Sequence, residues 1–174
     1  PKNTTLSRRA VVHFAVDTAV AWMTTQLDGL NTRFLSFNQG RDNGAGNPVN
    51  PGGFRTSYLW ERVWQRDAWM DILGRFMHVE PTDKGMAHTG AVIFPRYHQW
   101  DAVLKMEAHA RERGAGHNYL VQHSAGSGKS NTIAWLAHRL SNLHDAGDAK
   151  VFNKVIVITD RVVLDRQLQA TIAQ

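Results

Sequence analysis

The sequence predicts an α/β fold in which a parallel sheet begins in residues 91–174. Three observations support this prediction. Apolar residues recur at helical spacing across 133–140. A continuous apolar run at 155–158 is typical of a strand buried on both faces of a parallel sheet. The glycine-rich segment 126–130 lies between an expected strand and an expected helix, and such alternation favours parallel strands joined by right-handed crossovers.

The first part of the chain is expected to be rich in strands. Apolar residues alternate with more polar ones across 12–17, a period of two that predicts a strand. Residues 19–25 and 32–37 are further short strand candidates, and the turn-forming pair Asp28–Gly29 separates them. We therefore expect residues 1–40 to form one strand-rich segment.

A loop and a helical connector are expected in residues 41–90. The stretch 38–53 is dense in Gly, Asn and Pro, which is typical of a loop. The apolar residues of 69–76 lie on one face of a helix. Trp60 and Trp64 add an aromatic stripe beside that face. Two interpretations of this stripe are open, namely stacking on nucleic-acid bases and packing against a core.

The rest of the chain alternates between helices and strands. A helix is expected from about Trp100 to Gly114, followed by a short strand at 119–122. The glycine-rich segment, the next helix and the apolar run then follow in order. A last helix is expected after Asp160, whose carboxylate is placed to cap it.

The composition limits the classes of function. Of the 174 residues, 43% are hydrophobic and 20% are charged, as in folded globular domains. The net charge of +5 favours a polyanion such as nucleic acid as a partner, although mildly basic proteins are common. The absence of cysteine excludes disulfides and thiolate metal sites. No apolar stretch approaches the ~20 residues needed to cross a bilayer, so we expect no membrane partner. The lack of cysteine suits a reducing cytoplasm, and we expect a cytoplasmic location.

The segment 122–130 has the composition of a phosphate-binding loop, or P-loop. Glycine permits the backbone conformations in which successive N–H groups point at a phosphate, and the next helix directs its positive end at the same anion. Lys129 is placed to reach the β- and γ-phosphates, and the Ser130 hydroxyl is placed to bind Mg²⁺. His123 departs from the strict pattern, which begins with Gly. The residues expected to bind the nucleotide are Ser124, Ala125, Gly126, Ser127, Gly128, Lys129 and Ser130.

Gln99 precedes the P-loop by one expected helix and one expected strand, so it is placed to reach back to the nucleotide. A side-chain amide both donates and accepts, which suits the edge of adenine. The alternative is a polar residue that caps a helix, and the sequence leaves both open.

The end of the apolar run, 159–161, also has two interpretations. Asp160 is placed to hold Mg²⁺ through water, but no second acidic residue follows to orient the attacking water. The favoured interpretation is a strand-end motif of helicases, in which backbone groups and Arg161 face DNA phosphates.

Taken in order, these segments resemble the R subunit of type I restriction enzymes, from about Val11 to the end of the chain. The segments similar to the stretch that joins the nuclease and motor domains of that family are 35–40, 44–48 and 58–61. The segments similar to its motor motifs are 94–101, 122–130 and 159–168. That family carries His at the first P-loop position, as this chain does at His123.

The resemblance implies a helicase-like motor of superfamily 2 that uses ATP and Mg²⁺ to pull double-stranded DNA, with a nuclease domain that cuts it. Its partners would be the methylation (M) and specificity (S) subunits of a restriction-modification system. Residues 1–40 would be the last strands of the nuclease domain, 41–90 a connector, and 91–174 the start of the first RecA-like domain. Gln99 would sense adenine, and Arg161 would lie near DNA.

The resemblance further implies that the catalytic residues of both reactions lie outside this chain. The Glu-x-Lys nuclease set is expected before Pro1, and the Asp-Glu-x-His box and the arginine finger are expected after Gln174. We therefore expect the 174-residue chain alone to hydrolyse no ATP and cut no DNA. Two other functions are kept as alternatives. One is a stand-alone P-loop domain such as a small-molecule kinase, with Asp160 as the Mg²⁺ carboxylate, and the other is a non-catalytic DNA-binding module.

Overall fold

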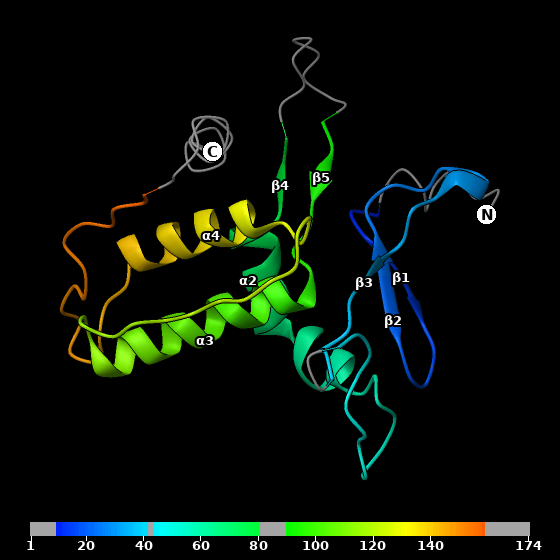
Figure 1. Ribbon diagram of the computed structural model, residues 1–174, viewed down its shortest axis with the longest axis horizontal. Coiled ribbons are helices and arrows are strands. Elements are labelled where there is room, and N and C mark those ends of the chain that lie inside the picture. The colour runs from blue at the N-terminus through cyan, green and yellow to red at the C-terminus, as the bar shows by residue number, and fades with distance from the viewer. Residues whose placement is uncertain (1–9, 42–43, 81–89, 159–174) are drawn as a thin grey trace. The chain divides into compact units, whose positions relative to one another are not determined.

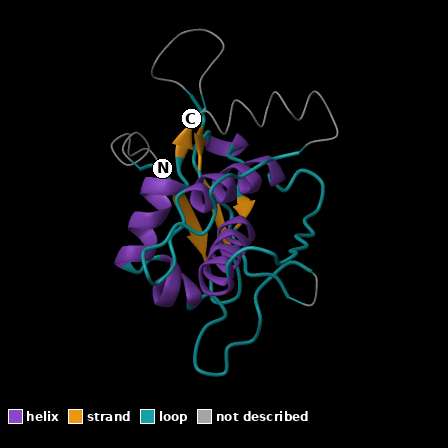
Figure 2. Ribbon diagram, turned by 90° about the vertical axis from the view of Figure 1, so that its left-hand side faces the viewer, coloured by secondary structure: helices purple, strands orange, loops and turns teal. Residues whose placement is uncertain are grey.

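The computed structural model describes residues 10–41, 44–80 and 90–158. The chain divides into two compact units between His98 and Gln99. Figure 1 labels the helices and strands along the chain. Helices and loops, with short strands, make up the described chain (Figure 2). Within the described ranges, no helix is both long enough and apolar enough to cross a bilayer.

Unit 1, residues 1–98, contains a three-stranded antiparallel sheet in the order β1-β2-β3. β1 (His13–Val16) pairs with β2 (Ala21–Thr24), which in turn pairs with β3 (Leu35–Ser36). A short 3-10 helix, Gly29–Asn31, lies in the connection between β2 and β3. The strands expected in this region are therefore confirmed, although each is shorter than its candidate range.

The turn between β1 and β2 is fixed by the side chain of Asp17. Its carboxylate accepts the backbone N–H of Ala19 at 2.6 Å and that of Val20 at 2.8 Å. The hydrogen bonds from Val20 and Ala19 lower the pKa of Asp17 because they stabilise the charged form. The Asp17 carbonyl also accepts the hydroxyl of Thr56 at 2.7 Å, which ties the turn to the following loop.

The loop expected at 38–53 is confirmed for its described residues, 38–41 and 44–53, and buried polar side chains attach it to the sheet. Asn47 is 2% exposed and donates to the Ala19 carbonyl at 2.9 Å and to Asn38 Oδ1 at 2.8 Å. It also accepts the backbone N–H of Gln39 at 2.8 Å. After the loop, the Tyr58 hydroxyl donates to the Phe37 carbonyl at 2.6 Å, and burial raises the pKa of this phenol.

The connector after the loop is helical, as expected. A π-helix, Leu59–Val63, leads into α2 (Arg66–Arg75), which covers most of the predicted helix face. β4 (His78–Val79) and β5 (Val92–Ile93) then form an antiparallel pair that the sequence did not indicate. Two-residue strands are too short to show a hydrophobic period, so their pairing is decided by the surroundings.

Aromatic side chains fill the core of unit 1. Phe14 packs against Phe37 at 5.2 Å and against Trp64 at 5.5 Å between ring centroids. Trp64 is nevertheless 39% exposed and Trp60 is 42% exposed. The ring contact supports the core-packing interpretation for Trp64, and both rings also retain an exposed face.

Unit 2, residues 99–174, is built on two long helices. α3 (Tyr97–Arg113) starts two residues before the unit boundary, and α4 (Lys129–Ser141) follows a connection that runs back along α3, so both helices point the same way (Figure 1). Both helices were expected and are confirmed. The buried apolar side chains of this unit include Trp100, Val103, Ala110, Ala134, Trp135 and Leu143.

The two strands expected in unit 2 do not form in the described residues. Among the described residues, 119–122 and 155–158 form no strand. Leu120 is 92% exposed, Ile156 80% and Ile158 89%. A strand requires a neighbouring strand for its N–H and C=O groups, and none of the described segments supplies one here. The parallel sheet therefore stays a prediction, and the helix expected after Asp160 lies outside the described residues.

Candidate nucleotide-binding site

The backbone of the P-loop is shaped by two glycines. Gly126 has φ +72° and Gly128 has φ +81°, both in the left-handed region that glycine adopts without steric cost. Between them, the Ser127 N–H donates to the Ser124 carbonyl at 3.3 Å and closes a turn. The loop thus bends back immediately before α4 begins at Lys129.

The Lys129 ammonium group lies across this turn. Its Nζ donates to the Ser124 carbonyl at 2.9 Å and to the His123 carbonyl at 3.2 Å. Lys129 is itself exposed to solvent, and the first turn of α4 contains no acidic residue. A full positive charge and the positive end of a helix dipole are therefore concentrated at one exposed turn, which favours the binding of an anion.

The Gly128 carbonyl is a shared acceptor at the start of α4. It accepts Gln99 Nε2 at 2.8 Å, and it also accepts the backbone N–H of Thr132 at 3.3 Å and the Thr132 hydroxyl at 3.4 Å. Gln99 is 3% exposed and Thr132 is 5% exposed. Glycine is favoured at residue 128 by its φ of +81°, and an added Cβ, 2.5 Å from Gln99 Nε2, would also force the Gln99 amide to shift.

Gln99 is thus brought to the P-loop, where it contacts the backbone of the loop itself. The amide that was expected to pair with adenine donates to Gly128. Its role toward adenine stays a prediction, while the contact establishes that α3 and the P-loop meet at this residue.

The other expected site residues divide by exposure. Ser124, Ala125 and Gly126 are exposed, and Ser130 is half-buried in the first turn of α4. Ser127 is buried, with an exposed fraction of 4%. The Lys129 ammonium group and the Ser130 hydroxyl come from adjacent positions at the N-terminus of α4, a combination that suits a polyphosphate. Across the described ranges, no group of three or more His, Asp or Glu side chains could hold a metal ion. Asp160 and Arg161 lie outside the described residues.

Two charged residues that join α3 to α4 were missed by sequence reasoning. Glu107 of α3 is 6% exposed and pairs with Arg139 of α4. The sequence did contain a signal for this pair, because Glu107 lies at helical spacing between Val103 and Ala110, two buried apolar positions. A carboxylate on an apolar helix face predicts a buried partner.

One comparison with known proteins found a match that includes this site. Residues 98–174 match the protein family described as SWI2/SNF2 ATPase, and the match includes most of α3, the P-loop and α4. No curated protein and no solved structure matches the chain. SWI2/SNF2 ATPases use ATP, typically with Mg²⁺, and the P-loop residues of this chain fit that use. Residues 98–174 are therefore similar in sequence to helicase-like ATPases of superfamily 2.

Proposed function

We propose that the chain is part of the R subunit of a type I restriction enzyme, in which ATP bound at 122–130 drives the translocation of double-stranded DNA. The observation that carries the proposal is the exposed P-loop of Gly126, Gly128 and Lys129 at the start of α4, within a segment that matches an ATPase family. The restriction assignment is supported by the motif order from 35–40 to 159–168.

Each P-loop group has a defined task in this proposal. The N–H groups of 126–130 and the α4 N-terminus bind the phosphate oxygens, while the Lys129 ammonium neutralises charge on the β- and γ-phosphates. The Ser130 hydroxyl would hold Mg²⁺, which would offset the negative charge of the phosphates. Gln99 fixes the Gly128 carbonyl and with it the turn into α4. We assign no described residue to the activation of water.

The nucleotide-binding part is tested by Lys129→Ala. Since a hydrogen bond to a charged group contributes about 1.5–3 kcal/mol, the substitution should weaken Mg²⁺–ATP binding by about 10- to 100-fold in calorimetric titration. Lys105→Ala is the matched control, because Lys105 is an exposed α3 lysine that pairs with Asp101 at 2.6 Å and lies outside the P-loop. Equal affinities for both variants would contradict the proposal.

The DNA-binding part is tested by the salt dependence of double-stranded DNA binding. We expect the affinity for DNA to fall steeply as the salt concentration rises, and Arg161→Ala to reduce the slope of log affinity against log salt by about one unit.

We further expect the chain to bind the M and S subunits, as measured by co-purification. A chain that binds ATP but neither DNA nor these subunits would favour the small-molecule kinase alternative, in which Asp160→Asn abolishes nucleotide-dependent activity.

A further inference from the structure

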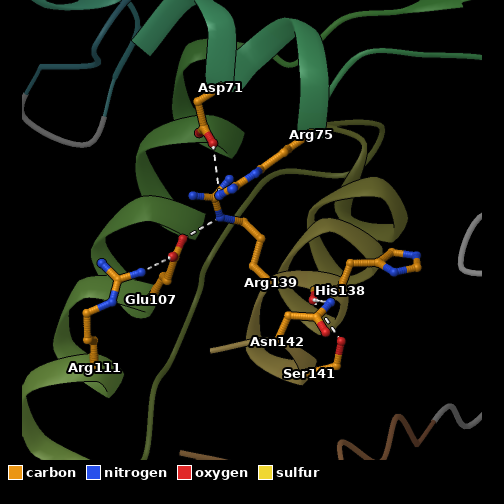
Figure 3. A network of polar contacts seen from close by, with 8 residues as sticks. All are labelled: Asp71, Arg75, Glu107, Arg111, His138, Arg139, Ser141 and Asn142. Atoms are coloured by element: carbon orange, nitrogen blue, oxygen red, sulfur yellow. Dashed lines mark hydrogen bonds and ion pairs between the residues drawn. The ribbon is translucent and has the colours of Figure 1, made fainter. Parts of the chain in front are cut away.

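A buried ion pair joins the two helices of unit 2. Glu107 accepts Arg111 of the same helix at 2.7 Å through Oε1, and through Oε2 it pairs with Arg139 Nε of α4 (Figure 3). The side chains of Glu107 and Arg139 are 8% and 9% exposed, whereas that of Arg111 is 52% exposed. The contact between α3 and α4 is therefore the buried one, and the Arg111 contact lies at the surface.

Burial makes this pair sensitive to geometry. A carboxylate removed from water is strongly destabilising unless charged hydrogen bonds replace its hydration, so the pair stabilises only the helix register that keeps both groups in contact. Because guanidinium donors are planar and directional, a small shift of one helix along the other would break the contact. The pair thus fixes α3 against α4 at one point.

The contact between Gln99 and Gly128 fixes the same two helices at a second point. Glu107 follows Gln99 by eight residues, which is about 12 Å along α3, and Arg139 follows Gly128 by eleven residues, or about 16 Å along α4. Two contacts so far apart on parallel helices determine both their axial register and their rotation. If the ion pair is lost, the hydrogen bond of 2.8 Å from the Gln99 amide to the Gly128 carbonyl no longer has this second contact to support it.

We propose that Glu107 and Arg139 are positioning residues for nucleotide binding. The pair keeps α3 and α4 in the register that holds Gln99 against the Gly128 carbonyl, and thereby sets the shape of the P-loop before the nucleotide binds. Preorganisation of this kind raises affinity because the loop loses less conformational freedom on binding. This inference rests on the nucleotide-binding part of the proposed function, and neither residue touches the nucleotide.

The test is a double-mutant cycle of Glu107→Gln and Gln99→Ala in the full chain, read as Mg²⁺–ATP affinity. Each single variant should weaken binding by about three- to tenfold, and the double variant should be no weaker than the weaker single one, since both act through one contact. The proposal would be overturned if the losses of affinity of the two single variants multiply in the double variant, or if Glu107→Gln leaves the affinity unchanged. Glu112→Gln is the matched control, because Glu112 is an exposed α3 glutamate with a 70% exposed side chain.

Two further variants separate positioning from a general loss of stability. Leu143→Ala removes a buried side chain of unit 2 that is 2% exposed, so it should lower the unfolding midpoint without changing ATP affinity while the chain is folded. If Glu107→Gln does not fold, the paired substitution Glu107→Leu with Arg139→Met removes both charges and keeps apolar volume. This paired variant should fold and still bind ATP about three- to tenfold more weakly, and full affinity would overturn the proposal.

Failure of the proposed function and failure of the positioning role of Glu107 and Arg139 would give different results. Absence of ATP binding in the unaltered chain overturns the proposed function. Hydrogen exchange of the nucleotide-free chain then still tests the positioning, because Glu107→Gln and Gln99→Ala should each speed exchange of the 124–132 amides, and their combination should add nothing. If the unaltered chain binds ATP and Lys129→Ala weakens it, but Glu107→Gln changes neither affinity nor exchange, only the positioning role fails.

Discussion

At the scale of single residues, the P-loop contains two glycines with the same conformation and different surroundings. Both have φ near +75°, at +72° and +81°. A Cβ at Gly126 would have nothing within 4 Å, whereas one at Gly128 would lie 2.5 Å from Gln99 Nε2. Gly126 is therefore favoured by its backbone alone, whereas at Gly128 an added Cβ would also displace the Gln99 amide.

This difference predicts the order of three alanine substitutions. Gly126→Ala should lower the free energy of unfolding by about 1 kcal/mol, the cost of the left-handed region for alanine. Gly128→Ala should cost about 1 kcal/mol more, because Gln99 must also move. Gly74→Ala in α2 should stabilise by about 0.5–1 kcal/mol, since its φ is ordinary and its surroundings are open. Urea unfolding measures all three, and equal costs at 126 and 128 would contradict the packing role of Gln99.

The Asp17 turn predicts a dependence of stability on pH. Its pKa is lowered in the folded chain by N–H donors, so the unfolded chain binds its proton more readily. The stabilisation is therefore present above the ordinary pKa of 3.8 and is lost as the pH falls through the lower, folded value. Asp17→Asn should be less stable than the unaltered chain near neutral pH, and the difference in urea midpoint should shrink on acidification. A gap that stays constant with pH would contradict this account.

At the scale of elements, the sequence predicted those whose pattern is local. The alternation at 12–17 and the helical spacing at 69–76 and 133–140 each lie within one element, and β1, α2 and α4 confirm them. The segments 119–122 and 155–158 are apolar enough for strands, but a strand also needs a partner that no local pattern provides. The β4–β5 pair went unpredicted for the opposite reason, because two residues carry no period.

The 38–53 loop shows how polar residues can fix an irregular element. Asn47→Ala would remove one hydrogen bond from each of three groups, namely the Ala19 carbonyl, Asn38 Oδ1 and the Gln39 N–H. Since an unsatisfied buried group costs about 1–3 kcal/mol, we expect Asn47→Ala to lower the free energy of unfolding by about 2–3 kcal/mol. Asn50→Ala is the control, because its hydrogen bonds to Gly52 and Phe54 are exposed, and it should cost less than about 1 kcal/mol. Similar costs in thermal unfolding would show that Asn47 does not hold the loop.

At the scale of the whole molecule, the chain has two units, and the proposed nucleotide site lies entirely in the second. A ligand stabilises the folded state to which it binds, by about 2.7 kcal/mol at 100 times its dissociation constant. We therefore expect Mg²⁺–ATP to slow hydrogen exchange across 99–141 and to leave 12–37 unchanged, as measured by mass spectrometry. Lys129→Ala should remove the effect, and protection confined to unit 1 would place the nucleotide elsewhere.

The sequence by itself determined the candidate site as a segment, because every group of a P-loop lies within nine consecutive residues, 122–130. Its two glycines, its lysine and the following helix are local features, and a local pattern is sufficient to recognise them. Only the tertiary structure decided what holds that segment in place. The Gln99–Gly128 and Glu107–Arg139 contacts join residues 29 and 32 positions apart, and they depend on how two helix faces pack against each other. Packing of that kind is set by the combined surfaces of both helices, which neither stretch of sequence contains alone.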